Sequence, residues 1–217
     1  MSKTLVIGAS GQIGQLITKT LVESKEVARA LVRDKSKLDE FKDSELEIVE
    51  ADLEEDFSHA FDGIDNVIFV AGSGGSTGAD KTLLIDLWAA KKAVDYAQKT
   101  NIKQFIMLSS IGADDPDAME SDIKPYLVAK HMADQYLMAS GVPYTIVRPG
   151  PLTNDEGEGK ITTRRPTTIK EMKIPRADVA KSILYILSRE DLNGKIFELF
   201  NGSYDIDTIL SIEFDLS

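Results

Sequence analysis

Short apolar runs alternate with longer amphipathic stretches along the whole chain. Seven runs occur, at residues 4–7, 27–32, 46–49, 65–70, 103–108, 141–147 and 194–200. Continuous apolar runs bounded by turns are typical of strands that are buried on both faces of a parallel sheet. Between the runs, apolar residues recur at helical spacing, as over residues 13–21. The pattern predicts an α/β fold in which about seven mostly parallel strands carry helices on both faces.

A glycine-rich turn joins the first strand to the first helix. Its sequence is Gly8-Ala9-Ser10-Gly11-Gln12-Ile13-Gly14. Gly8 allows a sharp turn off the strand, Gly11 lets a diphosphate approach the backbone, and Gly14 lets the helix pack closely against the strand. The N–H groups at the start of the helix then face the phosphates, and the Ser10 hydroxyl adds a donor. Strand, glycine turn and helix in this order predict a dinucleotide-binding site.

The end of the second strand indicates which dinucleotide is bound. Arg33 stands nineteen residues after Gly14, where the strand ends. A guanidinium group fits a 2′-phosphate, and Lys37 can join it. Asp34 follows one position later, where it either caps a helix over residues 35–41 or binds the ribose of NAD. We therefore expect NADP, with NAD as the alternative.

Two more strand ends contribute to the expected cofactor site. Asp52 and Leu53 follow the third strand, where they either contact the adenine or, for Asp52, cap the next turn. Ala71 and Gly72 follow the fourth strand, where small residues let the cofactor lie close. Residues 72–78 are rich in glycine and predict a loop over the mouth of the site.

Hydroxyl and ammonium groups follow the fifth strand. Ser109 and Ser110 stand at its end, where a hydroxyl can polarise a substrate carbonyl. Tyr126 and Lys130 come next, four residues apart on a predicted helix, so they share one face. An ammonium beside a phenol favours the phenolate, which makes tyrosine a usable acid or base near neutral pH. This pattern indicates proton transfer to or from a small-molecule substrate, with an ordinary surface pair of Tyr126 and Lys130 as the alternative.

These motifs occur in the order found in the short-chain dehydrogenase/reductases. They are the glycine turn, Arg33, Asp52-Leu53, Ser109-Ser110, Tyr126-x-x-x-Lys130 and Val147-Arg148-Pro149-Gly150. More closely, the chain resembles the atypical NAD(P)-binding branch, which is related to NmrA-like proteins, biliverdin-IXβ/flavin reductases and short epimerase/dehydratase-like proteins. The resemblance covers nearly the whole chain and implies a doubly wound Rossmann fold.

The resemblance also implies a role for each candidate residue. Tyr126 would donate or accept the substrate proton, and Lys130 would hold the nicotinamide ribose. Ser110, with Ser109 as the less favoured choice, would hold the substrate oxygen. Pro149-Gly150 would lie beside the nicotinamide. The chain departs from well-studied members after its fourth strand, where their Asn-Ala-Gly is replaced by Val-Ala-Gly.

The expected function is therefore an NADP-dependent oxidoreductase that transfers hydride between the cofactor and a small carbonyl or alcohol. Two alternatives stay open. One is a redox-sensing NADP-binding regulator without turnover, and the other is a short nucleotide-sugar epimerase or dehydratase. Longer epimerases have a larger C-terminal substrate domain, for which this chain has no room.

A length of 217 residues suits a single domain, 1–217, in which the irregular residues 151–175 form a small substrate cap. The acidic tail at 206–214 is expected to pack or pair loosely. A helix over residues 79–100 has a broad apolar face that includes Trp88. We expect this face to be core or half of a subunit interface, with Trp88 as a packing residue. The chain is thus expected to be a monomer or a homodimer.

Composition and charge narrow the function classes. The formal charge of −11 repels phosphate backbones and argues against nucleic-acid binding. The chain has no cysteine, and no apolar run reaches the length of a membrane span. Its two histidines show no ligand spacing, so no metal site is expected. Together these features predict a cytoplasmic protein that does not bind membranes.

Overall fold

A mostly parallel sheet forms the centre of the protein. The computed structural model describes residues 2–75, 77–118, 122–168, 170–187 and 189–215. Seven strands run parallel, in the spatial order β3 (Glu47–Glu50), β2 (Val27–Val32), β1 (Lys3–Ile7), β4 (Asn66–Phe69), β5 (Gln104–Leu108), β6 (Tyr144–Pro149) and β10 (Lys195–Asn201). They match the seven apolar runs, so the predicted Rossmann-type sheet is confirmed. Two short antiparallel strands, β8 (Lys160–Thr162) and β11 (Tyr204–Asp205), extend the sheet beyond β10.

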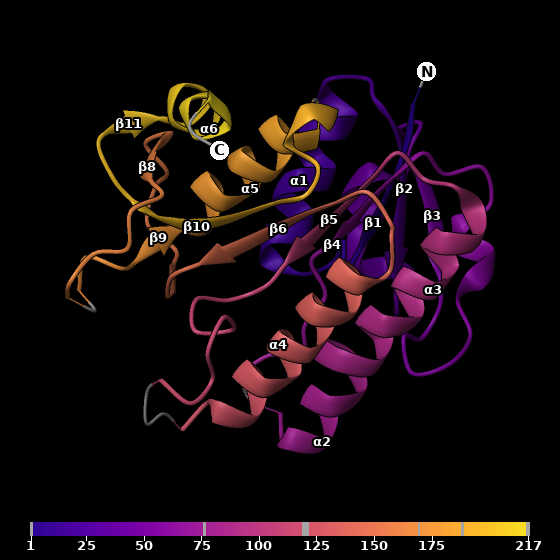
Figure 1. Cartoon of the computed structure of the whole chain (residues 1–217). Helices are drawn as coiled ribbons and strands as arrows, with labels where there is room; N and C mark the ends of the chain where they lie inside the picture. The colour runs from indigo at the N-terminus through magenta and orange to yellow at the C-terminus, as the bar shows by residue number, and fades with distance from the viewer. Residues whose placement is uncertain (1, 76, 119–121, 169, 188, 216–217) are drawn as a thin grey trace.

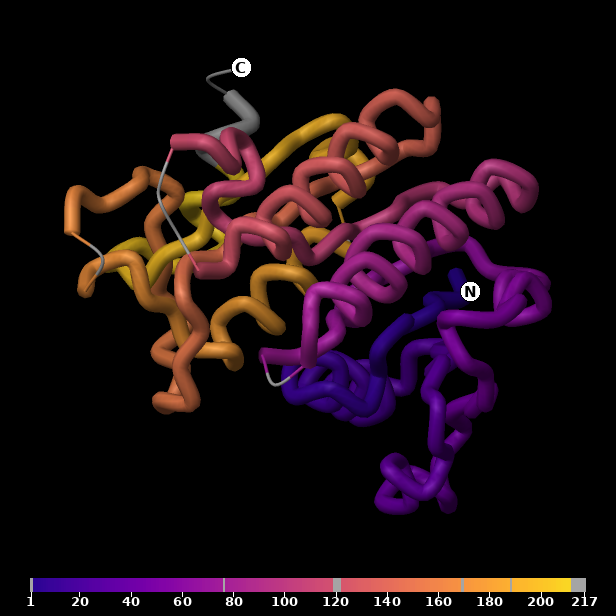
Figure 2. Tube along the Cα trace, turned by 90° about the horizontal axis from the view of Figure 1, so that it is seen from below, coloured from indigo at the N-terminus to yellow at the C-terminus, as the bar shows by residue number. Residues whose placement is uncertain are grey.

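Helices cover both faces of the sheet (Figure 1). The α-helices are α1 (Gln12–Glu23), α2 (Ala79–Lys81), α3 (Ala90–Thr100), α4 (Lys124–Ala139), α5 (Arg176–Leu187) and α6 (Ile206–Asp215). A π-helix, η3 (Thr82–Ala89), joins α2 to α3. Short 3-10 helices are η1 (Lys35–Phe41), η2 (Ser58–Phe61) and η4 (Glu190–Leu192). Figure 2, which is seen from below, shows α3 and α4 side by side in front of the sheet.

Strand residues alternate between two apolar cores because successive side chains point to opposite faces. In β1, Val6 packs in the upper core, between the sheet and helices α1 and α5. Its neighbour Leu5 packs in the lower core, between the sheet and helices α3 and α4. Both side chains are fully buried. The sheet is therefore covered on both faces, as its near-continuous apolar strands require.

Two expectations about the helices were wrong in part. The tail at 206–214 is not a loose segment but helix α6, which packs on α5. Residues 79–100 do form a helical stretch, but its middle turns are π-helical. Trp88 in that middle part is 49 % exposed, so it is not a core residue. The widened turn instead directs a different side chain inward, Asp86, which is fully buried.

Residues 151–175 leave the sheet after β6 and return at α5. They contain β8 and a parallel pair of two-residue strands, β7 (Leu152–Thr153) and β9 (Ile174–Pro175); residue 169 lies outside the described residues. At the start of α5, the Asp178 carboxylate accepts hydrogen bonds from the Glu158 and Gly159 N–H groups. The segment is thus tied to the first turn of α5. Among the described residues, no helix is long and apolar enough to cross a membrane.

Two neighbouring residues of α4 differ in burial, so we expect their substitution by alanine to have different effects on stability. Leu137 is fully buried, whereas Met138 is 38 % exposed. We expect Leu137→Ala to lower the free energy of unfolding by about 2–5 kcal/mol, because it leaves a cavity. Met138→Ala should lower it by less than about 1 kcal/mol. Urea unfolding followed by circular dichroism measures both, and equal losses would contradict this packing.

Candidate active site

The predicted site residues meet at one edge of the sheet. Parallel pairing places the carboxyl ends of β1, β2, β4, β5 and β6 along that edge. The residues that follow these strands are Gly8, Arg33, Gly72, Ser110 and Gly150. In doubly wound folds this edge is where ligands bind.

The glycine turn forms a close-packed cradle. Gly8 has a φ of +91°, and a Cβ on it would lie 2.6 Å from the backbone nitrogen of Ala71. A Cβ on Gly14 would overlap with the Gly8 carbonyl oxygen. Gly11 and Gln12 are exposed at the start of α1, which has no side-chain cap, and the first helical bond runs from Gln15 N–H to the Gly11 carbonyl. The turn therefore presents backbone N–H groups to an anion, which fits a dinucleotide diphosphate.

The acidic residue after β2 is already engaged. One oxygen of Asp34 accepts hydrogen bonds from the Ser36 N–H, at 3.0 Å, and from the Ser36 hydroxyl, at 2.7 Å. These bonds cap η1 and lower the pKa of Asp34 below its ordinary value. Arg33 and Lys37 are both exposed beside it. The capping alternative for Asp34 thus holds in the structure, and the exposed cations Arg33 and Lys37 lie close to it.

The residues after β3 form a turn. Asp52 accepts a hydrogen bond of 2.9 Å from the Glu54 N–H, so the capping alternative is present for this residue too. Its side chain is exposed, and Leu53 is half-buried against the lower core. Lys81 of α2 makes an ion pair with Glu54. This contact joins the turn to the end of the 72–78 loop, of which residue 76 lies outside the described residues.

Tyr126 and Lys130 share one face of α4, as their spacing requires. The Lys130 Nζ lies 5.7 Å from the centre of the Tyr126 ring and donates a 3.1 Å hydrogen bond to the Leu108 carbonyl at the end of β5. Tyr126 is half-buried, whereas Lys130 is only 3 % exposed. Burial alone would lower the pKa of Lys130, but the facing oxygens of Tyr126 and Asp86 outweigh it and raise that pKa.

Asp86 is a site residue that sequence reasoning missed. Its Oδ1 lies 3.3 Å from the Lys130 Nζ, and its Oδ2 accepts a 3.1 Å hydrogen bond from the Ser73 N–H. A Cβ on Gly72 would lie 3.1 Å from Oδ1, so glycine leaves room for this carboxylate. Asp86 thus links Lys130 to the loop after β4. A period of 3.6 residues does not predict which side chain a π-helix turns inward, so the apolar face gave no signal for it.

The two serines differ in their surroundings. Ser109 is buried, and its hydroxyl donates a 2.8 Å hydrogen bond to Asp134 of α4. The same Asp134 oxygen accepts from the Arg148 Nε at 3.0 Å. Burial raises the pKa of Asp134, although both donors oppose that shift. Ser110 is half-exposed, and its hydroxyl donates only to the adjacent Ile111 carbonyl. Of the two, Ser110 is therefore the more exposed serine at this strand end.

The chain beyond β6 is folded back on itself. Gly150 is buried, and a Cβ there would overlap with the Met172 carbonyl oxygen. Pro149 accepts a hydrogen bond from the Ile111 N–H, which holds the ends of β5 and β6 together. The Thr153 Oγ1 is buried and finds no hydrogen-bond partner in the described part of the chain. A polar atom left in this way next to the glycine cradle fits a site that receives a polar cofactor.

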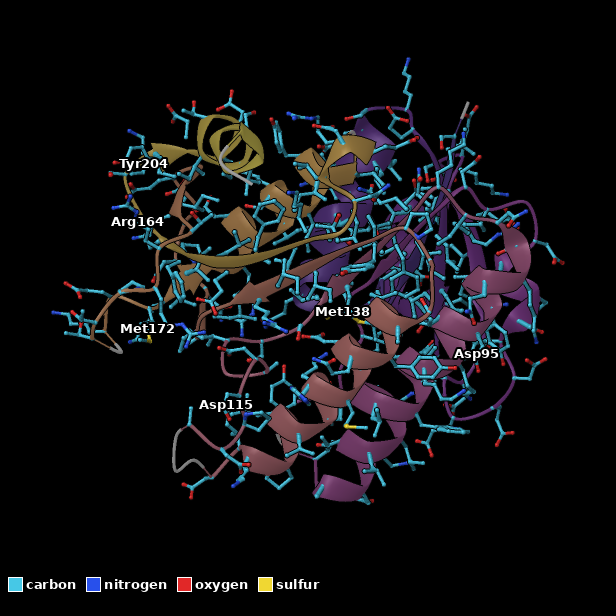
Figure 3. All side chains as sticks on the ribbon, viewed as in Figure 1. Asp95, Asp115, Met138, Arg164, Met172 and Tyr204 are labelled. Carbon is cyan, nitrogen blue, oxygen red and sulfur yellow. The ribbon has the colours of Figure 1, made fainter. Side chains whose placement is uncertain are left out.

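One basic residue of the 151–175 segment, Arg165, is paired with carboxylates. Arg165 donates to Asp114, at 2.9 Å, and to Glu198 of β10. Figure 3 shows Arg164 and Tyr204 at the left of the view, near β8 and β11, and Asp115 on the loop that leads to α4. Arg165 therefore ties the segment to the loop after Ser110. No cluster of potential metal ligands occurs among the described side chains.

Comparison with known proteins gives consistent results. The family model described as NAD(P)H-binding matches residues 8–190. The "uncharacterized sugar epimerase" YhfK of Bacillus subtilis is 40% identical over 208 residues, 94% of this chain and 96% of that protein. A putative NAD-dependent epimerase/dehydratase from Bacillus halodurans superposes with a TM-score of 0.91 at 44% identity, covering 98% of this chain and 100% of that one. The oxidoreductase ylbE of Lactococcus lactis superposes with a TM-score of 0.86 at 27% identity, covering 98% of this chain and 97% of that one.

The buried ion pair of Asp86 and Lys130 leads to a testable prediction. Asp86→Asn removes the charge facing Lys130, so burial should lower the pKa of Lys130 below its value in the wild type. We expect the free energy of unfolding at neutral pH to fall by about 3–5 kcal/mol, because a buried charge loses its partner. An NMR titration with 13C-labelled lysine measures the pKa, and urea unfolding measures the stability.

Two further variants serve as controls. Asp95→Asn breaks a half-exposed pair with Lys91 and should cost less than about 1 kcal/mol. Combining Asp86→Asn with Lys130→Met removes both buried charges and should recover part of the lost stability. An unchanged Lys130 pKa in Asp86→Asn would show that the pair does not control this ammonium.

Proposed function

Because the chain belongs to the NAD(P)H-binding family of atypical short-chain dehydrogenase/reductase proteins, we propose that it is an NADP(H)-dependent oxidoreductase acting on a small carbonyl or alcohol. One observation carries the proposal. A buried lysine, Lys130, lies beneath the ring of Tyr126 at the same sheet edge as the glycine cradle. A phenol with a fixed cation beside it is suited to moving a proton close to a bound dinucleotide.

The chain's own residues would bind and orient the cofactor. The Gly11 N–H already donates to the Gly8 carbonyl, so the backbone N–H groups of Gln12 and Ile13 would hold the diphosphate. Arg33 with Lys37 would hold the 2′-phosphate. Ala71, Gly72 and Pro149-Gly150 would border the cofactor at the strand ends, although Asp86 packs against Gly72 and the Met172 carbonyl packs against Gly150. When bound, NADP(H) supplies or accepts a hydride, which is chemistry that no side chain provides.

Tyr126 would handle the proton. Its hydroxyl would protonate the carbonyl oxygen in reduction, or accept the proton from the alcohol in oxidation. Lys130 would keep its charge beside that phenol, supported by Asp86 and by the Leu108 carbonyl. Ser110 would hold the substrate oxygen. Ser109 is less suited to this role, because its hydroxyl already donates to Asp134.

A second candidate is an epimerase or dehydratase reaction. It is favoured by the names of the 40% and 44% identical relatives, and it would use the same Tyr126 and cofactor site. The two functions differ in net redox change, because an epimerase returns the hydride to its substrate. Net NADPH consumption with a carbonyl substrate therefore separates them. A regulator that binds cofactor without turnover is the third alternative.

Cofactor preference depends on Arg33 in this proposal. We expect Arg33→Ala to weaken NADP+ binding about tenfold to hundredfold, because a charge-assisted contact to the 2′-phosphate is lost. NAD+ binding should change by less than about threefold. Isothermal titration calorimetry measures both, with the exposed Arg164→Ala as a control that alters neither. Equal affinity of the wild type for NAD+ and NADP+ would overturn the preference.

Catalysis depends on the Tyr126 hydroxyl. We expect Tyr126→Phe to lower turnover of a small carbonyl substrate about 10²- to 10⁴-fold, while the Kd for NADPH stays unchanged. Oxidation of NADPH with a panel of aldehydes and ketones, followed by absorbance, provides the rates. Tyr144→Phe, at the start of β6 and so at the opposite edge, is the matched control. Undiminished turnover in Tyr126→Phe would exclude this tyrosine as the proton donor.

A further inference from the structure

A cavity lies beside the glycine cradle, between the first turns of α1 and α5. Its volume is about 460 Å³, within the range of small-ligand sites. Gln12 and Gln15 line it from α1, Arg176 lines it from the start of α5, and Thr153 and Asn154 line it from the segment after β6. The packing of α1 against α5 fixes its width, because Ile17 and Ile183 are fully buried in one core.

Arg176 differs from the paired arginines of this protein. Its Nη1 donates a 2.7 Å hydrogen bond to the Asn154 Oδ1, a neutral partner. Arg148 and Arg165, by contrast, pair with carboxylates. Within the described residues, Arg176 makes no ion pair, although it is half-buried. Its charge is thus held in place by an amide and stays available to an anionic ligand.

Arg176 determines the net charge of the side chains that line the cavity. Lys19 also lines the cavity, and so do the carboxylates Glu40 and Asp155. The two cations offset the two carboxylates, on a chain whose formal charge is −11. Loss of Arg176 would leave a net negative cavity, which repels phosphate. The first turn of α1 contains no acidic residue, so its N–H groups add to the attraction for an anion.

We propose that Arg176 is a second ligand of the dinucleotide diphosphate, contributed by α5 and held in position by Asn154. This inference rests on the proposed cofactor binding. The glycine cradle supplies neutral donors, which are backbone N–H groups and the Ser10 hydroxyl. Arg176 would supply the charge-assisted contact that the cradle lacks. Thr153, from the segment after β6, lines the same cavity. Cofactor binding would thereby link the segment after β6 to α1.

Three probes separate the diphosphate from the rest of the cofactor. NADP+ and 2′-phospho-ADP-ribose both contain the diphosphate, whereas adenosine 2′-monophosphate contains only the 2′-phosphate. We expect Arg176→Gln to weaken the binding of NADP+ and of 2′-phospho-ADP-ribose about tenfold to hundredfold. The binding of adenosine 2′-monophosphate should stay unchanged. Arg33→Ala should weaken the binding of all three probes. Isothermal titration calorimetry on the full chain gives each Kd.

Two further variants test whether the loss of binding is specific to the guanidinium of Arg176. Lys181→Gln removes the same charge from the exposed face of α5 and should leave all three Kd values unchanged. Arg176→Lys should retain part of the affinity, because the charge remains without the fork of donors. Unchanged binding of 2′-phospho-ADP-ribose to Arg176→Gln would overturn the inference, and so would equal losses for all three probes. If the wild type bound none of them, the proposed function itself would fail.

Discussion

The charge of Lys130 constrains the structure around it more than any other single group. An ammonium that is 3 % exposed is costly unless it is paired and hydrogen-bonded. Three elements meet that requirement: β5 offers the Leu108 carbonyl, η3 offers Asp86, and α4 places Tyr126 one turn away. Because Asp86 also binds the Ser73 N–H, the same charge fixes the loop after β4. Tyr126 and Lys130 of α4, the loop after β4 and the end of β5 are therefore held together around one buried charge.

Much of this could be predicted from the sequence because it depends on local rules. Buried strands give apolar runs, and the glycine turn reports a close approach that only glycine permits, as Gly8 against Ala71 confirms. Parallel topology then brings the strand ends together. Tyr126 and Lys130 share a face because helical spacing fixes it. These features need no knowledge of side chains that are distant in the sequence.

The rest could not be predicted because it depends on distant partners. Asp86 is one acidic residue within an apolar helical stretch, and only the π-helical turn and the position of Lys130 make it a site residue. Likewise, Ser109 and Ser110 are equivalent in sequence, and Asp134, twenty-five residues after Ser109, distinguishes them. The cavity lined by Gln12 and Arg176 forms where two helices far apart in the chain pack together. Periodicity does not carry this information.

Residues 151–175, the proposed substrate side of the site, are the part that the sequence pattern determines least. Residues 151–175 contain no long element of their own, so polar contacts to the body hold them: Asp178 binds their backbone, and Arg165 binds Asp114 and Glu198. Such contacts fix the ends of a segment while its lining residues are free to vary, because few of them are buried in a core. Relatives of this chain are named as epimerases and as an oxidoreductase, so the shared fold alone does not fix the reaction. In the proposed function, substrate choice would depend on residues 151–175, whereas cofactor binding and proton transfer would depend on residues at the sheet edge.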